Sequence, residues 1–113
     1  MKKTPIAALV LALASAALAP ALAAEIPDLA QTKQCLGCHS VDRDALAPSL
    51  RNIGTKYRKV RQAESIMVEI ITKGSPLLAD GKHWGAMKMP GAGTRVPVSE
   101  AEARQLADWI LAL

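Results

Sequence analysis

Two cysteines and a histidine stand close together in the first half of the chain, and no other cysteine is present. Cys35, Cys38 and His39 form the pattern C-x-x-C-H. Two thiols three positions apart lie about one helical turn from each other, so both can add to the two vinyl groups of one porphyrin. His39 can then bind the iron through an imidazole nitrogen. The pattern is the attachment signal of c-type haem, and it predicts one covalently bound haem c.

Three other uses of these residues have to be weighed. A disulfide between Cys35 and Cys38 is plausible for an exported chain. A thioredoxin-like redox pair needs a βαβ context, and the residues around Cys35 show no strand pattern. A zinc site with Cys35, Cys38, His39 and His83 has the right number of ligands, but adjacent residues rarely reach one tetrahedral ion. An export signal and a suitable methionine favour haem.

Haem iron takes a second axial ligand, and a thioether there favours the reduced state. Met67 falls on the apolar face of a predicted helix, which indicates a core position. Met89 precedes Pro90, which restrains the backbone beside it, and we favour Met89 over Met87 for this reason. His83 is a remote candidate, and we expect it to be an exposed loop residue.

Four segments are predicted to be helical, the first from Pro27 and Asp28 at its start and the other three from apolar residues at helical spacing. The predicted helices cover residues 27–35, 49–58, 61–73 and 99–111. The first should run into the C-x-x-C-H motif, and the second contains Gly54, which weakens the prediction. Gly74 ends the third. Ser99 and Glu102 form a capping box at the start of the last, whose Trp109 should pack where the last helix meets the first.

The segment between the last two helices, residues 75–98, is rich in glycine and proline and follows no helical or strand period. A loop of this length in a compact domain is usually functional. It contains Trp84, Met87 and Met89, and the Trp84 N–H is able to donate to a haem propionate. We expect this segment, here named the strap, to pass over the second face of the haem.

The N-terminus has the pattern of a secretory signal peptide over residues 1–23. A basic start is followed by an apolar stretch at residues 6–19, which is shorter than a membrane span needs, and then by the small-x-small pattern Ala21-Leu22-Ala23. We predict cleavage after Ala23 and a domain at residues 24–113 with no membrane anchor. Loss of Lys2 and Lys3 lowers the formal net charge from +4 to +2. The chain has no long basic run and 3% aromatic residues, which argues against nucleic-acid binding.

The order of the motifs resembles the short bacterial class I cytochromes c, which donate electrons to nitrite reductase and terminal oxidases. The resemblance rests on residues 35–39, 47–48, 73–74, 83–90 and 102–111. It implies an all-α fold of three to five helices wrapped around one haem. It also implies that Met89 is the distal ligand, that the carbonyl of Pro48 accepts a hydrogen bond from the ring of His39, and that Trp84 meets a propionate. A glycine usually precedes the first cysteine, where this chain has Gln34.

The predicted function is that of a periplasmic one-electron carrier between larger redox proteins. With His39 and Met89 both bound, no iron position is open to oxygen or peroxide, so the chain is not expected to be an enzyme. One alternative is the haem subunit of a periplasmic oxidoreductase complex. A haem peroxidase or a ligand sensor with a weak methionine bond is another, and a thiol oxidoreductase is a distant third.

The expected partners are redox protein donors and acceptors, for example a cytochrome complex, nitrite reductase or a terminal oxidase, and the chain is expected to be a monomer. The resemblance also implies that the haem edge nearest the thioether bonds is exposed and that electrons pass there. We expect a small apolar patch there, made by Leu36, Gly37, Ala86 and Met87. Three cations are close enough in sequence to form a rim around it, namely Lys33, Arg43 and Lys88.

Overall fold

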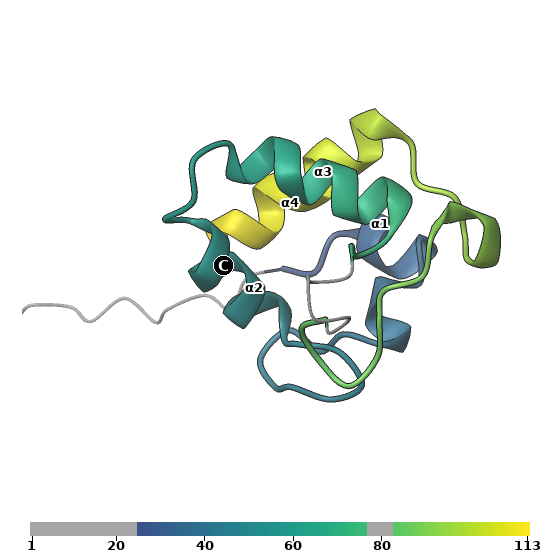
Figure 1. Ribbon diagram of the computed structural model, residues 1–113, viewed down its shortest axis with the longest axis horizontal. Coiled ribbons are helices and arrows are strands. Elements are labelled where there is room, and N and C mark those ends of the chain that lie inside the picture. Colours follow the sequence, from purple (N-terminus) through teal and green to yellow (C-terminus); the bar gives the residue numbers. More distant parts are fainter. Residues whose placement is uncertain (1–24, 77–82) are drawn as a thin grey trace, which may run out of the picture.

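The computed structural model describes residues 25–76 and 83–113, and it is all-helical over these ranges (Figure 1). The elements, in chain order, are α1 (Asp28–Thr32), the 3-10 turn η1 (Cys35–Gly37), α2 (Leu50–Tyr57), α3 (Ala63–Lys73), the 3-10 turn η2 (Ala92–Thr94) and α4 (Glu100–Ala112). The predicted signal peptide lies outside the described residues. Within the described part, no helix is long and apolar enough to cross a membrane.

Helix α4 begins at the predicted capping box. The Ser99 hydroxyl accepts from the backbone N–H of Glu102 at 3.2 Å, and the Glu102 carboxylate accepts from the N–H of Ser99 at 2.9 Å. Two of the N–H groups that a helix leaves unpaired at its start are therefore satisfied. The inner face of α4 is buried, and its members are Ala103, Leu106, Ala107 and Ile110. Trp109 is half-buried and packs against this core.

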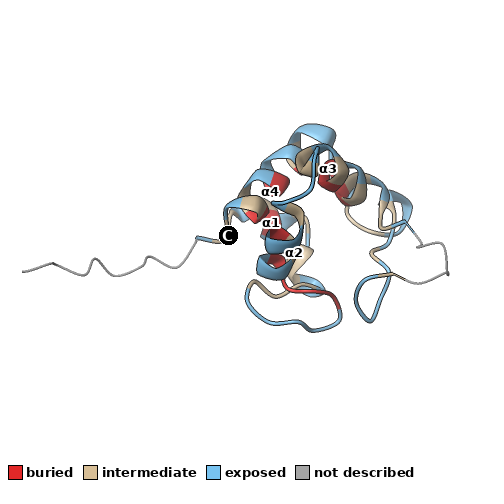
Figure 2. Cartoon of the chain, turned by 60° about the vertical axis from the view of Figure 1, so that its left-hand side comes forward, coloured by how far each residue is buried: buried red, intermediate tan, exposed pale blue. Residues whose placement is uncertain are grey.

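Helices α3 and α2 make most of the contacts with α4. Figure 1 shows α3 running along α4, and Figure 2 shows buried positions on the faces that the helices turn toward one another. Helix α3 contributes Met67, Val68 and Ile71 to the core, and Met67 is only 3% exposed. It ends as predicted at Gly74, whose φ of 92° is in the region that favours glycine.

Helix α2 is present despite Gly54, and the structure explains this glycine. A β-carbon on Gly54 would lie 2.2 Å from the carbonyl oxygen of Ile110, so the two helices approach more closely than any side chain allows. Two arginines of this region also bind the end of α4. Arg58 Nη1 donates to the carbonyl of Leu111 at 3.0 Å, and Arg51 donates to the carbonyl of Leu113.

The first helix is shorter than predicted. We expected it to run from residue 27 into Cys35, but α1 ends at Thr32 and the C-x-x-C-H motif starts the separate turn η1. The break is at Gln34, whose φ of 58° is left-handed and incompatible with a continuing α-helix. Gln34 occupies the position where the resembling proteins usually have glycine, and its backbone geometry shows why glycine suits that position.

Candidate functional site

The two cysteines lie on one tight turn. The backbone N–H of Cys38 donates to the carbonyl of Cys35 at 3.3 Å, and the N–H of His39 donates to the same carbonyl at 3.0 Å. Both thiols are free, Cys35 half-buried and Cys38 exposed, so the structure does not contain the alternative disulfide. Burial raises the pKa of the Cys35 thiol. Two unpaired thiols on one turn are what covalent attachment to one porphyrin requires.

His39 is fixed by a buried backbone carbonyl. Its Nδ1 lies 2.7 Å from the carbonyl oxygen of Pro48, nine residues further along the chain. A carbonyl can only accept, so Nδ1 carries the proton and Nε2 carries the lone pair. Burial lowers the pKa of His39, which favours the neutral ring, while the bond to Pro48 partly opposes this shift. A neutral imidazole with an unprotonated Nε2 can bind iron, and the hydrogen bond at Nδ1 fixes the orientation of its ring.

The loop between His39 and α2 is held at several points. The N–H of Ala47 donates to the carbonyl of Cys38 at 3.2 Å, and the N–H of Leu50 donates to the carbonyl of Ser40 at 2.9 Å. The carboxylate of Asp44 accepts from the N–H of Ser49 at 2.7 Å, and this bond is the main reason that the pKa of Asp44 is lowered. The acceptor for His39 is therefore part of a tied loop.

The strap returns to this loop at Gly85. A β-carbon on Gly85 would lie 2.7 Å from Pro48 Cδ, and the φ of Gly85 is 100°. Two residues later, the N–H of Met87 donates to the carbonyl of Leu46 at 3.3 Å. In Figure 1 the two segments run past each other beneath the helices. The predicted site therefore joins two parts of the chain that are far apart in sequence.

The two candidate methionines of the strap differ in their surroundings. Met89 is half-buried, and its carbonyl accepts from the N–H of Ser75 at 3.1 Å, which ties it to the end of α3. Met87 is 52% exposed. Met67 is in the hydrophobic core, as its helical position indicated. A tied and half-buried thioether is the better iron ligand of the two, so this geometry favours Met89 while leaving the assignment a prediction.

Trp84 and His83 of the strap differ in how far their side chains are buried. Trp84 is 40% exposed, and the ammonium of Lys56 lies 4.2 Å from its ring centroid, a cation–π contact. The contact of Trp84 with a propionate stays a prediction. The expectation that His83 is exposed is wrong, because the side chain is half-buried and its Nδ1 is shielded from solvent without a hydrogen-bond partner among the residues that the structure describes.

Only two of the three cations predicted to surround the docking surface are exposed. Arg43 and Lys88 are exposed. Lys33 is not a rim cation: its side chain is 18% exposed, and its Nζ lies 2.9 Å from a carboxylate oxygen of Glu102 and 2.9 Å from the carbonyl of Pro97. Leu46, which the sequence reading missed, is 51% exposed next to Met87. Its place in a loop without periodicity gave no reason to single it out.

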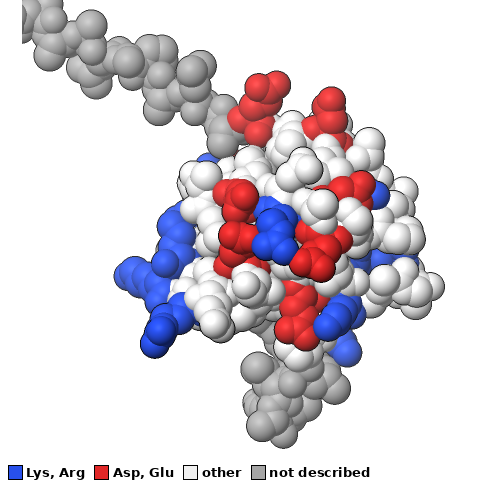
Figure 3. All heavy atoms as spheres, turned by 90° about the horizontal axis from the view of Figure 1, so that it is seen from above, with Lys and Arg blue, Asp and Glu red and all other residues white. Residues whose placement is uncertain are grey.

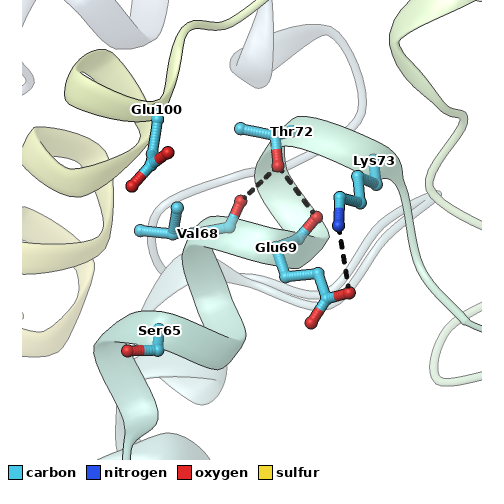
Figure 4. A pocket seen from close by; sticks show the side chains of 6 residues that line it. All are labelled: Ser65, Val68, Glu69, Thr72, Lys73 and Glu100. Atoms are coloured by element: carbon cyan, nitrogen blue, oxygen red, sulfur yellow. Dashed lines mark hydrogen bonds and ion pairs between the residues drawn. The ribbon is translucent and has the colours of Figure 1, made fainter.

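Two hollows lie on the described surface. One, of about 390 Å³, is formed by α3 and the start of α4 and is shown in Figure 4. None of its lining residues belongs to the C-x-x-C-H motif. The other, of about 350 Å³, is lined by His39 together with Ile26, Leu36, Ser40 and Val41. Within residues 25–76 and 83–113, no three or more His, Cys, Asp or Glu side chains are grouped so that they could hold a metal ion, and the zinc alternative needs such a group.

Comparisons with known proteins agree with this geometry. Residues 23–113 match the family model described as "Cytochrome c". The chain is 37% identical to cytochrome c-552 of Nitrosomonas europaea over 88% of its own length and 89% of that protein. It is 36% identical to cytochrome c-551 of Stutzerimonas stutzeri, covering 86% and 85%. The crystal structure of wild-type Nitrosomonas europaea cytochrome c552 superimposes with a TM-score of 0.64 over 76% of this chain and 96% of that one.

Proposed function

The chain belongs to the cytochrome c family, and we propose that it carries single electrons between larger redox proteins in the periplasm. It is a small carrier of the c-551/c-552 type with covalently bound haem c, and it is not an enzyme. The periplasmic location, the partners and the residues that hold the haem are the parts that we propose. When bound, the haem would supply an iron that gains and loses one electron.

The hydrogen bond from His39 to Pro48 is the observation that carries the assignment of the proximal ligand. It leaves Nε2 unprotonated and fixes the ring, directly after two free thiols on the same turn. In the proposed arrangement Cys35 and Cys38 hold the porphyrin through thioether bonds, and His39 binds the iron. A ligand that is held in one orientation by a buried carbonyl needs little rearrangement when the charge of the site changes.

Met89 is proposed as the second ligand because its backbone is bound to Ser75 and its side chain is half-buried. A thioether favours the reduced state. With His39 and Met89 both as ligands, the chain would leave no iron position for a small molecule. This arrangement argues against the alternative of a peroxidase or a ligand sensor.

The absorption spectrum of the exported protein, together with its mass, tests the proposal. A narrow α-band in the reduced state and a denatured mass equal to residues 24–113 plus one haem are expected. That mass also tests cleavage after Ala23, because a retained leader would add residues 1–23. A bare polypeptide from a host that attaches haem would overturn the assignment of Cys35 and Cys38.

The partner surface is proposed at the apolar edge where the strap meets the loop before α2. The exposed residues that we propose for it are Gly37, Leu46, Ala86 and Met87, and the half-buried Leu36 is included from the motif. Lys88 and Arg43 supply positive charge nearby. On the side of α3 and α4, where Figure 3 shows several acidic side chains, Arg104 pairs with Glu64 and Glu100. The exposed Lys88 and Arg43 support an acidic partner, such as a nitrite reductase, a terminal oxidase or a cytochrome complex, on the strap side.

A further inference from the structure

The described part of the strap, residues 83–98, has a single short 3-10 turn, η2, and no other regular element. Its position must therefore be fixed by contacts with the rest of the chain. One such contact is the hydrogen bond from the N–H of Ser75 to the carbonyl of Met89 at 3.1 Å. A single neutral hydrogen bond adds little net stability, so further contacts are needed to hold a defined geometry.

Arg95 supplies them from the far end of the same loop. Its Nε donates to the carbonyl of Pro90 at 2.8 Å, and its Nη2 donates to the carbonyl of Ile71 in the last turn of α3. Nη1 lies 3.4 Å from the carbonyl of Val96. The guanidinium is a rigid fork of donors, so one half-buried side chain joins the residue after Met89 to a helix that lies elsewhere in the sequence.

The junction that Arg95 spans is closely packed. A β-carbon on Gly74 would lie 2.8 Å from the carbonyl of Met89, and one on Gly91 would lie 2.9 Å from the carbonyl of Lys73. The carbonyl of Ile71 belongs to the last turn of α3, where helical carbonyls have no intrahelical partner. A positive charge at this end of a helix is also favourable. The Arg95 guanidinium therefore pairs with a carbonyl at the end of α3 and also holds the strap in place.

We propose that Arg95 is a positioning residue that locks the Met89–Pro90 part of the strap to the end of α3. The inference rests on the proposed function in that it takes Met89 as the iron ligand. The contacts of Arg95 with Pro90 and Ile71 do not depend on that assignment.

The test uses the haem-loaded protein and three variants. Arg95→Met removes the guanidinium donors and the positive charge, while Arg95→Lys keeps the charge but cannot donate to all the carbonyls at once. Arg58→Met is the matched control, because Arg58 also donates to a carbonyl at a helix end, that of Leu111 in α4, away from the strap. Amide hydrogen exchange at Ser75 and the reduction potential are measured for each, with the ferric methionine–iron band recorded for the wild type.

In Arg95→Met, exchange at Ser75 should rise on the order of tenfold above any change in the core of α4, and the potential should fall because Met89 is held less firmly. Arg95→Lys, which keeps the charge without the full set of contacts, should also raise exchange at Ser75, and Arg58→Met should change neither the exchange nor the potential. If Arg95→Met takes up no haem, Arg95→Lys alone still tests the exchange. Exchange at Ser75 that is unchanged, or that rises only as much as in α4, would overturn the inference. A missing methionine–iron band in the wild type would instead contradict the proposed ligand.

Discussion

Gly54 in α2 lies so close to the carbonyl oxygen of Ile110 in α4 that a β-carbon would stand only 2.2 Å from it. Gly54→Ala should therefore force the helices apart and lower the free energy of unfolding by about 1–3 kcal/mol, although alanine is the better helix former. Denaturant unfolding of the haem-loaded protein measures this. Gly93→Ala is the control, because a β-carbon there meets nothing within 4 Å. A Gly54→Ala protein as stable as the wild type would show that the crossing is looser than described.

Gln34 offers a change of the opposite sign. Its left-handed φ of 58° is unfavourable for a residue with a β-carbon. Gln34→Gly should raise the free energy of unfolding by up to about 1 kcal/mol, the relief of strain less the greater entropy of glycine in the unfolded chain. Gln31→Gly, within α1, should destabilise instead. Thermal unfolding of both variants gives the comparison, and a loss of stability in both would contradict the argument.

Met89 and Met87 should differ in the spectrum of the ferric protein. Met89→Ala should abolish the methionine–iron band and lower the reduction potential, because a thioether favours the reduced iron. Met87→Ala is the matched control, since it removes the same side chain two residues away from a position that is 52% exposed. The opposite pattern would assign the ligand to Met87.

Lys33 and Glu102 should be coupled in a way that depends on pH. The pKa of Glu102 is lowered, first by its hydrogen bond to Lys33 and then by the N–H of Ser99. The stability that this carboxylate contributes is present above its unfolded pKa, about 4.3–4.5, and is lost as the pH falls further. A double-mutant cycle of Lys33→Met and Glu102→Gln should give a coupling at pH 7 that fades in this acid range. A coupling of constant size would exclude the ion pair as its source.

Lys88 should affect the rate at which the carrier meets an acidic partner. Lys88→Glu should slow the second-order electron-transfer rate at low ionic strength, and the difference should shrink as salt rises. Lys73→Glu is the control, because it makes the same change of charge on the surface of α3 shown in Figure 4, where Lys73 lies beside Glu69. Equal slowing by both variants would indicate an effect of net charge without a defined docking face.

The helices could be predicted because their signals are local. The capping box of Ser99 and Glu102 and the glycine stop at Gly74 depend on neighbouring residues, and both are present in the structure. The short first helix could not be predicted, because no local rule made Gln34 adopt a left-handed conformation. Gly54 lowered confidence in a helix that needs this glycine for a contact with Ile110, 56 residues later.

The site residues could likewise be predicted where the signal is local, and could not where it depends on distant residues. The C-x-x-C-H motif predicted the cysteines and His39 from adjacent residues, and the bond from His39 to Pro48 came from a family resemblance. Lys33 was misassigned because its partners, Glu102 and Pro97, are more than sixty residues away. Arg95 went unnoticed for the same reason, since its acceptor Ile71 belongs to another helix.

The hydrogen bonds that tie Met89 and Pro90 to α3 join protein groups only. In the proposed assignment they would still hold the Met89 backbone if its sulfur were not bound to the iron. The thioether would then remain a short distance from the iron at a high effective concentration. A dissolved ligand, which has to arrive by a bimolecular encounter, would have to compete with it. A tether of this kind protects the carrier kinetically from side reactions, in addition to any preference of the iron for sulfur.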